Sequence, residues 1–369
     1  MAAGKVPCTV VTGFLGSGKT TLINHILTGE HGKKIAVIEV GVDDALVLDT
    51  KEEIFEMNNG CICCTVRGDL IRILTKLLKR KNRFDHILIE TTGLADPAPV
   101  AQTFFVDDDL KHSLRLDSIL TVVDAKHILL HLDEEKPDDV AFADRVLLNK
   151  IDLVTEEEKR EVVRRIKAIN RTTKVIECQQ ARVELDRILG LQSFDLEQIL
   201  AMDPAFLKDH HHHEHEHEHE HGHGHEHEHK DDDCAQCAAG DPDHSHHHGH
   251  SHKHDSRVSS VGIECEGALD MQRLNEWLST LLQEKGADIY RSKGILNIAG
   301  SDDKYVFHGV HMMLQFGSSA EGLGKPWQPG QPRFNRVVFI GKDLNRQELN
   351  DGFRSCMADA NGSGSNGAA

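Results

Sequence analysis

The chain has 369 residues, of which 28% are charged and 39% hydrophobic, a balance typical of a soluble protein with two domains. Its formal net charge of −18 argues against nucleic-acid binding, because phosphate backbones attract basic surfaces. No apolar run is long enough to cross a bilayer, no signal-peptide core is present, and the nine cysteines are clustered as cytosolic thiols rather than spread as a disulfide framework. We therefore expect a cytoplasmic protein with no nucleic-acid or membrane partner.

In the first 207 residues, short apolar runs alternate with amphipathic helical patterns such as Leu70–Lys79 and Glu156–Ile169. The apolar runs are nearly continuous, as expected for parallel strands buried on both faces. Strand and helix repeated in this order predict a doubly wound parallel-sheet α/β domain over residues 1–207. The predicted strands are Cys8–Thr12, Lys34–Glu39, His86–Glu90, Ser118–Asp124, Arg145–Asn149 and Lys174–Cys178.

A phosphate-binding loop follows the first predicted strand. The segment Gly13-Phe-Leu-Gly-Ser-Gly-Lys-Thr matches G-x4-G-K-[ST] in full, between a strand and a helix as the motif requires. We expect the glycines to let backbone amides approach the phosphates, Lys19 to reach the β- and γ-phosphates, and the Thr20 hydroxyl to bind Mg²⁺. The nucleotide-binding residues predicted here are Gly13, Gly16, Ser17, Gly18, Lys19, Thr20 and Thr21.

An acid and a glycine follow the third predicted strand, in the run Ile87-Leu-Ile-Glu90-Thr-Thr-Gly93. This form places a carboxylate near Mg²⁺ or the attacking water, and the Gly93 amide near the γ-phosphate. Lys19, Thr20 and Glu90 are therefore the predicted catalytic residues.

The strand Arg145–Asn149 leads into Asn149-Lys150-Ile-Asp152, the N-K-x-D pattern of GTPases. In that pattern the aspartate accepts hydrogen bonds from guanine donors that adenine does not present in the same way. We therefore predict that Asn149, Lys150 and Asp152 bind the nucleotide, and that GTP is favoured over ATP.

Three cysteines, Cys61, Cys63 and Cys64, lie within four residues just before a predicted helix. A helix N-terminus lowers a thiol pKa and favours the thiolate, which binds soft or borderline metals. Three sulfurs suit Zn²⁺ or Cu(I) better than Mg²⁺. Inert structural cysteines and a redox dithiol are the alternative interpretations.

Residues 208–256 interrupt the alternation of strands and helices. Nineteen of the 27 histidines lie between His210 and His254, and the segment has almost no apolar side chains to bury. We expect a disordered insert that buffers metal ions with low specificity, to which Cys234 and Cys237 add a thiolate pair. A solvated linker without metal function is the alternative.

A second predicted domain covers residues 257–357 and a disordered tail covers 358–369. The pattern of the second domain starts with a strand at Val261–Cys265. A helix follows, with an apolar side formed by Leu274, Trp277, Leu278, Leu281 and Leu282. Strand, helix, three strands and a helix predict a small α+β, ferredoxin-like domain. The later strands are expected at Tyr305–Phe307, Val310–Phe316 and Val337–Ile340, with a final helix over Asn345–Met357.

Taken together, these motifs resemble the CobW family of metallochaperone GTPases, and in particular its eukaryotic branch of zinc-regulated GTP metalloprotein activators. The resemblance rests on the P-loop, the three cysteines, the run from Glu90 to Pro97 and the N-K-x-D pattern. It continues in the second domain at Tyr290-Arg-Ser-Lys-Gly-Ile-Leu and Arg336-Val-Val-Phe-Ile-Gly341.

This resemblance implies a GTPase that transfers zinc to client metalloproteins and couples the nucleotide state to metal affinity. The implied cofactors are GTP, Mg²⁺ and Zn²⁺, and the implied metal ligands are Cys61, Cys63, Cys64 and Glu39. The partners would be client zinc metalloproteins, and a homodimer is left open. Two alternatives remain: a metal-buffering, nucleotide-binding protein with little turnover, and a cobalt or nickel chaperone of the same fold.

The chain departs from its family at two places. Relatives carry Asn-Glu-Phe-Gly-Glu after the second strand, whereas here Glu39 leads directly into Val40-Gly-Val-Asp-Asp44. Glu39 aligns with either glutamate of that segment and so keeps one carboxylate in place. A second gap lies between Val140 and Ala141, where relatives have further helical turns. These losses would affect hydrolysis and metal transfer more than nucleotide binding.

Overall fold

The computed structural model describes residues 5–29, 31–40, 54–57, 65–79, 84–91, 97–133, 138–193 and 257–359. In these ranges no helix combines the length and the apolar composition that a membrane span needs. The domain boundaries expected beside residues 207, 256 and 357 are not tested by these ranges and stay predictions.

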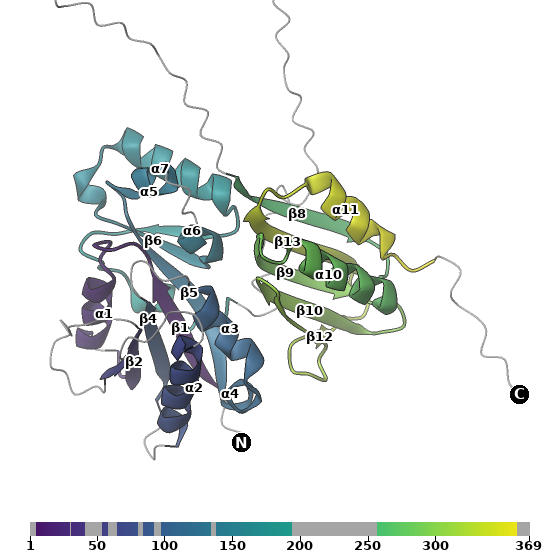
Figure 1. Cartoon of the computed structure of the whole chain (residues 1–369), viewed down its shortest axis with the longest axis horizontal. Helices are drawn as coiled ribbons and strands as arrows, with labels where there is room; N and C mark the ends of the chain where they lie inside the picture. Colours follow the sequence, from purple (N-terminus) through teal and green to yellow (C-terminus); the bar gives the residue numbers. More distant parts are fainter. Residues whose placement is uncertain are drawn as a thin grey trace, which may run out of the picture. The chain divides into compact units, whose positions relative to one another are not determined.

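The first sheet has seven parallel strands in the order β3-β2-β4-β1-β5-β6-β7 (Figure 1). The chain reaches β4 on one side of β1 and then continues with β5 on the other side, so the sheet is doubly wound as predicted. Ligands bind such sheets outside the carboxyl ends of the strands, where the order reverses. The strands are β1 (Val6–Thr12), β2 (Ile35–Val40), β3 (Ile54–Met57), β4 (His86–Thr91), β5 (Leu114–Asp124), β6 (Arg145–Asn149) and β7 (Lys174–Glu177).

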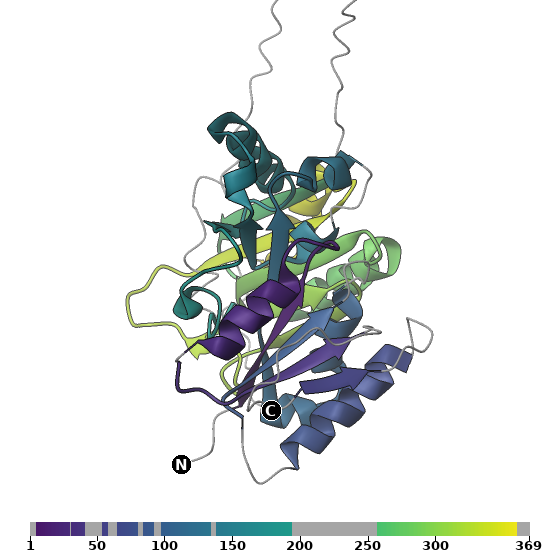
Figure 2. The ribbon, with the colours of Figure 1, turned by 90° about the vertical axis from the view of Figure 1, so that its left-hand side faces the viewer.

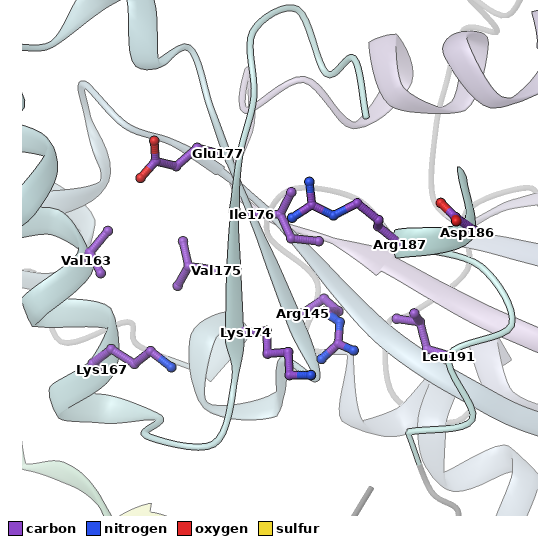
Figure 3. Close-up of a pocket in the computed structure, with 10 residues that line it drawn as sticks. All are labelled: Arg145, Val163, Lys167, Lys174, Val175, Ile176, Glu177, Asp186, Arg187 and Leu191. Carbon is purple, nitrogen blue, oxygen red and sulfur yellow. The ribbon is translucent and has the colours of Figure 1, made fainter. Parts of the chain in front are cut away.

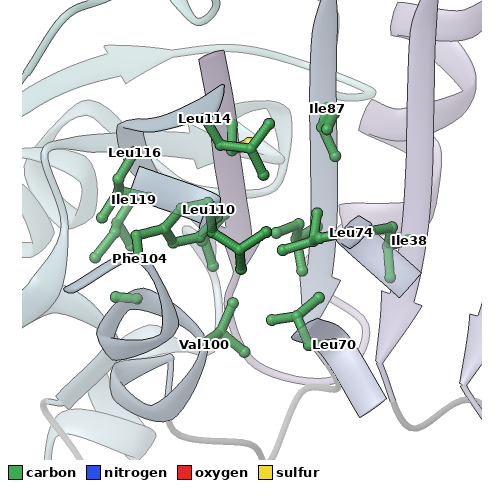
Figure 4. Packing of buried hydrophobic residues seen from close by; sticks show 14 of the residues in the cluster. Ile38, Leu70, Leu74, Ile87, Val100, Phe104, Leu110, Leu114, Leu116 and Ile119 are labelled. Carbon is green, nitrogen blue, oxygen red and sulfur yellow. The ribbon is translucent and has the colours of Figure 1, made fainter. Parts of the chain in front are cut away.

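Helices cover both faces of this sheet (Figures 1 and 2). On one face, Leu70 and Leu74 of α2 and Phe104 of α3 pack against Ile38 and Ile87 (Figure 4). On the other face, the buried side of α1 packs against the alternate residues of the same strands. The helices are α1 (Lys19–Thr28), α2 (Thr65–Leu78), α3 (Ala98–Val106), α4 (Asp108–Ser113), α5 (Ile128–Asp133), α6 (Asp138–Phe142) and α7 (Glu156–Ile169), with 3-10 turns η1 (Ile151–Leu153) and η2 (Leu185–Arg187).

The second sheet is antiparallel and carries two helices on one face (Figure 1). Strand β13 lies between β8 and β9 and is antiparallel to both, so β8-α10-β9 is a split β-α-β unit. This arrangement confirms the expected α+β class. Its elements are β8 (Val258–Glu266), α10 (Met271–Lys285), β9 (Ile289–Asn297), β10 (Asp303–Val310), β11 (Met313–Gly317), β12 (Lys325–Pro326), β13 (Phe334–Lys342) and α11 (Arg346–Ser355).

Two details of the second domain differ from expectation. A single strand over Val310–Phe316 is wrong: β10 ends at Val310, His311 turns the chain with a φ of 50°, and β11 starts at Met313. The last helix ends at Ser355, before the predicted Met357, and Asn345 is its N-cap residue, whose side chain accepts a hydrogen bond from the Glu348 amide.

A buried ion cluster joins the two sheets, which belong to one compact unit. Asp144, just before β6, accepts hydrogen bonds through Oδ1 from Arg291 Nη2 and Lys293 Nζ of β9, at 2.6 Å each. Its Oδ2 accepts from the Ile119 amide at 2.9 Å. Burial alone would raise the pKa of Asp144, but the two cations hold this pKa down at about 2. The carboxylate is therefore ionised and fully bonded inside the protein.

The buried side chain of His86 makes the stability of the folded protein depend on pH. His86 is 1% exposed, and its Nε2 lies 2.9 Å from Thr9 Oγ1. Burial lowers its pKa from 6.5 to about 4, although Asp117 opposes the shift. As the pH falls from 6.5 to 4, the unfolded chain binds a proton that the native ring refuses, so stability decreases over this window by about 2–3 kcal/mol. Below pH 4 this contribution stops changing.

Urea unfolding at a series of pH values checks this expectation. The His86→Gln variant keeps a hydrogen-bonding group but should lose this part of the pH dependence. His112, whose ring is exposed on α4, supplies the control, and His112→Gln should retain the slope of the wild type. A His86→Gln variant with an unchanged slope between pH 6.5 and 4 would contradict the prediction.

Candidate nucleotide-binding site

The loop after β1 has a backbone that only glycine allows at two positions. Gly13 has a φ of 132°, and a Cβ there would lie 2.1 Å from the Val122 carbonyl oxygen. Gly18 has a φ of 109°, and a Cβ there would lie 2.4 Å from Asn149 Nδ2. Gly16, with a φ of 76°, has open space around it. The loop thus brings its backbone close to β5 and β6 and leaves room on its outer side.

The start of α1 presents polar groups that the protein itself does not bond. Gly18 is the N-cap residue, so no side chain caps the first amides of the helix. The Ser17 hydroxyl is buried and has no hydrogen-bond partner among the described residues. Unbonded amides at a helix N-terminus and a buried hydroxyl beside them are the groups that bind a phosphate. Thr21, on the same first turn, is exposed. Thr20, whose hydroxyl faces the carboxylate of Glu90, is half-buried.

Lys19 lies folded back on the loop. Its ammonium donates to the carbonyl oxygens of Gly13 at 2.6 Å and Phe14 at 3.1 Å. The residue is 7% exposed, and burial lowers its pKa despite the nearby carboxylates of Glu90 and Asp139. The cation is therefore held inside the phosphate loop, at the position from which it can turn toward a ligand.

Two buried carboxylates face each other across neighbouring strands. Glu39 of β2 and Glu90 of β4 are in register, and they are 3% and 5% exposed. Thr20 Oγ1 lies 3.5 Å from Glu90 Oε1. Burial, together with the charge of Glu39, raises the pKa of Glu90 to about 7. The structure thus brings Thr20, Glu39 and Glu90 together at the carboxyl ends of these strands.

Asp139 of α6 is a candidate that the sequence interpretation missed. Its Oδ1 accepts from the Thr12 hydroxyl at 2.7 Å, and the Thr91 hydroxyl donates to Thr12 at 3.0 Å. Its charge also acts on Lys19. No motif marks Asp139, because it lies in a short helix beside the place where relatives have extra residues.

The N-K-x-D segment follows β6 and supports the phosphate loop. Asn149 Nδ2 donates to the Ser17 carbonyl at 2.9 Å, while its Oδ1 accepts from the Ala181 amide at 2.9 Å. Lys150 adopts a φ of 61° and donates to Asp124 Oδ2 at 2.7 Å. Asp124 ends β5 and is a second residue that the sequence interpretation did not assign. Its position as an acid at a strand end was the available signal.

Asp152 and the cysteines complete the predicted residues. Asp152 lies in η1, exposed, and forms no hydrogen bond or ion pair within the described ranges. Its carboxylate is therefore free to accept hydrogen bonds from a base. Gly93, Cys61, Cys63 and Cys64 lie outside the described residues, and the described ones contain no cluster of three metal-binding side chains.

Two family models match the chain. One describes the CobW/HypB/UreG nucleotide-binding domain and matches residues 7–177. The other describes the C-terminal domain of the cobalamin synthesis protein cobW and matches residues 258–357. The two matches coincide with the two sheets.

Two curated proteins are similar to the chain over most of its length. It is 34% identical to the zinc-regulated GTPase metalloprotein activator 1 of Schizosaccharomyces pombe, over 92% of this chain and 83% of that protein. It is 31% identical to the zinc chaperone YjiA of Escherichia coli, over 94% of this chain and 98% of that protein. The crystal structure of Zn(II)-bound YjiA GTPase from E. coli has a TM-score of 0.66 to this chain at 26% identity, over 96% of this chain and all of the other.

Proposed function

The chain belongs to the CobW/HypB/UreG family of nucleotide-binding proteins, and on this premise we propose that it is a zinc metallochaperone that binds and hydrolyses GTP. The observation that carries the proposal is the loop from Gly13 to Thr20. Gly13 and Gly18 let the backbone approach β5 and β6, and Gly16 leaves open space on the outer side. The first amides of α1 have no capping side chain, and the Ser17 hydroxyl has no partner among the described residues. These are the features that a triphosphate requires.

In this proposal each described group has one role. The amides at the start of α1 bind the phosphates, and the Lys19 ammonium leaves the Gly13 and Phe14 carbonyls to bind the β- and γ-phosphates. Asp152 accepts hydrogen bonds from the guanine base. Asn149, the first residue of the base-binding segment, connects that segment to the phosphate loop through its hydrogen bond to the Ser17 carbonyl.

Magnesium fits the oxygen donors of this site. Thr20 and Glu90 supply a hydroxyl and a buried carboxylate, the hard ligands that Mg²⁺ prefers. When bound, the ion would neutralise charge that develops on the phosphates. Without a cation, burial and the charge of Glu39 hold the pKa of Glu90 at about 7, so a bound Mg²⁺ would favour the ionised carboxylate beside the attacking water.

Zinc is the cargo in this proposal. Its ligands are Cys61, Cys63 and Cys64, with Glu39 as the oxygen donor. Because Glu39 is in register with Glu90, a metal held by Glu39 changes the charge next to the catalytic carboxylate. This contact gives a physical route by which metal binding and nucleotide binding influence each other. The client proteins, the homodimer and the cytoplasmic location remain predictions from the sequence.

The proposal is tested by the rate of GTP hydrolysis in the purified full chain, with and without Zn²⁺ and always with Mg²⁺. We expect turnover of GTP that changes when zinc is added. A chain that binds GTP but shows negligible turnover in both conditions would instead be a metal-buffering protein, in which the bound nucleotide controls conformation without being hydrolysed.

Replacing Cys61, Cys63 and Cys64 together with serine should remove tight zinc binding and leave GTP binding in the absence of zinc unchanged. In the wild type, GTP and zinc should change each other's affinity by the same factor, equivalent to about 1–3 kcal/mol. Competition against a chromophoric zinc chelator, with and without a non-hydrolysable GTP analogue, measures this factor.

Cys265→Ser is the matched control for this experiment. Cys265 is a half-buried free cysteine on β8, and burial raises its pKa, so it is a poor metal ligand. This variant should bind zinc as the wild type does. Equal zinc affinity of the wild type with and without the analogue would show that the two sites are independent.

A further inference from the structure

A pocket of about 610 Å³ lies at the edge of the first sheet, beside β7 (Figure 3). Arg145 and Lys174 are the first residues of β6 and β7, whereas the nucleotide motifs follow the ends of their strands. The pocket therefore extends to the amino ends of β6 and β7, whereas the phosphate loop lies at the carboxyl end of β1. Its lining contains four basic residues, Arg145, Lys167, Lys174 and Arg187, and two acidic ones, Glu177 and Asp186.

Three of the basic side chains gather on one face of β7. Arg145 and Lys174 are partners in the parallel register of β6 and β7, so their side chains share a face, and Arg187 of η2 lies on the same side (Figure 3). Burial lowers the pKa of Arg145; the charge of Asp144 opposes this shift, and the charge of Arg187 adds to it. Hence Arg145 and Arg187 are close enough to repel each other.

Two carboxylates lie near these cations: Asp186 lines the same pocket, and the charge of Asp144 acts on Arg145. Arg145, Lys174 and Arg187 form no ion pair within the described part of the chain, and the Glu177 carboxylate is bonded to Lys159 at 2.9 Å. A group of unpaired cations in a hollow is unexpected in a chain with a net charge of −18. It indicates that the pocket binds an anionic partner.

The strand beside the cations has an unused edge. Among the described strands, β7 is the last of its sheet. The Cys178 amide donates to the Leu148 carbonyl at 2.9 Å, so backbone groups of every second residue point toward β6. The backbone groups of Val175 and Glu177, which lie between those residues, therefore face away from the sheet.

The opposite face of β7 offers a small apolar wall of two valines, with Lys167 and Glu177 on the same side (Figure 3). Both charged groups already have partners, because the Lys167 ammonium donates to the Thr173 carbonyl and Glu177 pairs with Lys159. Val163 of α7 and Val175 are both half-buried and line the pocket on the side away from the three cations (Figure 3). A compact anion such as phosphate would use the cations and leave this wall and the strand edge without a role. An extended chain uses all three features, because its side chains alternate between the two faces.

We propose that the edge of β7 binds an extended acidic segment of a partner protein, which adds to the sheet as a further strand. Its acidic side chains lie on the face of Arg145, Lys174 and Arg187, and its apolar side chains lie against Val163 and Val175. This inference goes beyond GTP and zinc, and the binding can be measured without either.

The test uses a labelled ten-residue peptide of alternating glutamate and valine, with fluorescence anisotropy on the full chain. The control peptide has the same composition with its glutamates and valines in two blocks. We expect the alternating peptide to bind at least about tenfold more tightly, because only this pattern places acids and valines on opposite faces. Equal affinities would overturn the proposal.

Charge reversal identifies the site on the protein. Lys174 and Arg187 are exposed, so the variant Lys174→Glu with Arg187→Glu should fold and lose at least about tenfold in peptide affinity. The matched control reverses two exposed lysines before β2, Lys33→Glu with Lys34→Glu, and should bind as the wild type does. An equal loss in both variants would mean that overall charge, not this pocket, attracts the peptide.

Backbone methylation separates strand addition from simple charge attraction. Two further peptides carry N-methyl groups on all valine amides or on all glutamate amides. In an extended strand the amides of alternate residues point to opposite edges, so either the valine amides or the glutamate amides face β7, but not both. One methylated peptide should therefore lose binding and the other should keep it. Binding by both, or displacement of the alternating peptide by inorganic phosphate or by a single-stranded oligonucleotide at constant ionic strength, would overturn the proposal.

Discussion

Replacing Lys19 with alanine should abolish GTP binding. Lys19 is the cation held inside the phosphate loop, with its ammonium 2.6 Å from the Gly13 carbonyl oxygen. A triphosphate in the loop would offer it charged oxygens in a site with little water, where such bonds are strongest. Calorimetric titration with a non-hydrolysable GTP analogue measures the loss, which we expect to be complete at accessible concentrations.

Lys126→Ala is the control for the loss of a positive charge. Lys126 lies shortly after Asp124, the last residue of β5. Its side chain is exposed and pairs with Glu158 at 3.1 Å. This variant should bind the analogue nearly as well as the wild type does. Unchanged affinity in the Lys19→Ala variant would remove the assignment of the loop as the phosphate site.

The Asp144→Asn variant should be strongly destabilised. It keeps an oxygen for the Ile119 amide but removes the charge that compensates Arg291 and Lys293, and Arg291 is 2% exposed. Leaving a buried cation without its partner costs about 3–5 kcal/mol. Because the native pKa of Asp144 is about 2, its stabilisation is present above pH 3.8 and is lost as the pH falls from 3.8 to 2. Denaturant unfolding at neutral pH measures the difference.

Two further variants establish the cause of this loss. Asp144→Asn combined with Arg291→Gln removes the charge on both sides and should recover part of the stability. Asp108→Asn removes a carboxylate from an exposed pair with Lys111, where solvent already screens the charge, and should leave stability unchanged. If Asp144→Asn unfolds at the same denaturant concentration as Asp108→Asn, the buried cluster does not stabilise the native protein.

The elements that could be predicted from the sequence carry their signals locally. Strand β6 and helix α7 have the predicted bounds, Arg145–Asn149 and Glu156–Ile169. The helix begins at Thr155, whose hydroxyl accepts from the Glu158 amide while the Glu158 side chain accepts from Thr155, a complete capping box. The phosphate loop was predictable for the same reason, because glycines at fixed spacing indicate positions where the backbone adopts conformations that other residues rarely adopt.

Other features depend on contacts between distant residues and left no local signal. Strand β3, Ile54–Met57, was not predicted because four residues at a sheet edge do not form a recognisable pattern. Asp144 and Arg291 are 147 residues apart in the chain, so their pairing follows only from the packing of the two sheets. The division between β10 and β11 depends on the backbone of His311, a residue that rarely adopts a positive φ.

The position of β13 has a consequence for synthesis of the chain on the ribosome. The last strand of the first sheet ends at Glu177, so that sheet can close while more than a third of the chain is still to be made. The second sheet must wait for Phe334–Lys342, because β8 and β9 pair only through β13. A nascent chain that stalls before Phe334 exposes two unpaired strand edges, the feature that recruits chaperones or leads to aggregation. Truncations in this region should therefore reduce the yield of protein even when they spare every nucleotide-binding residue.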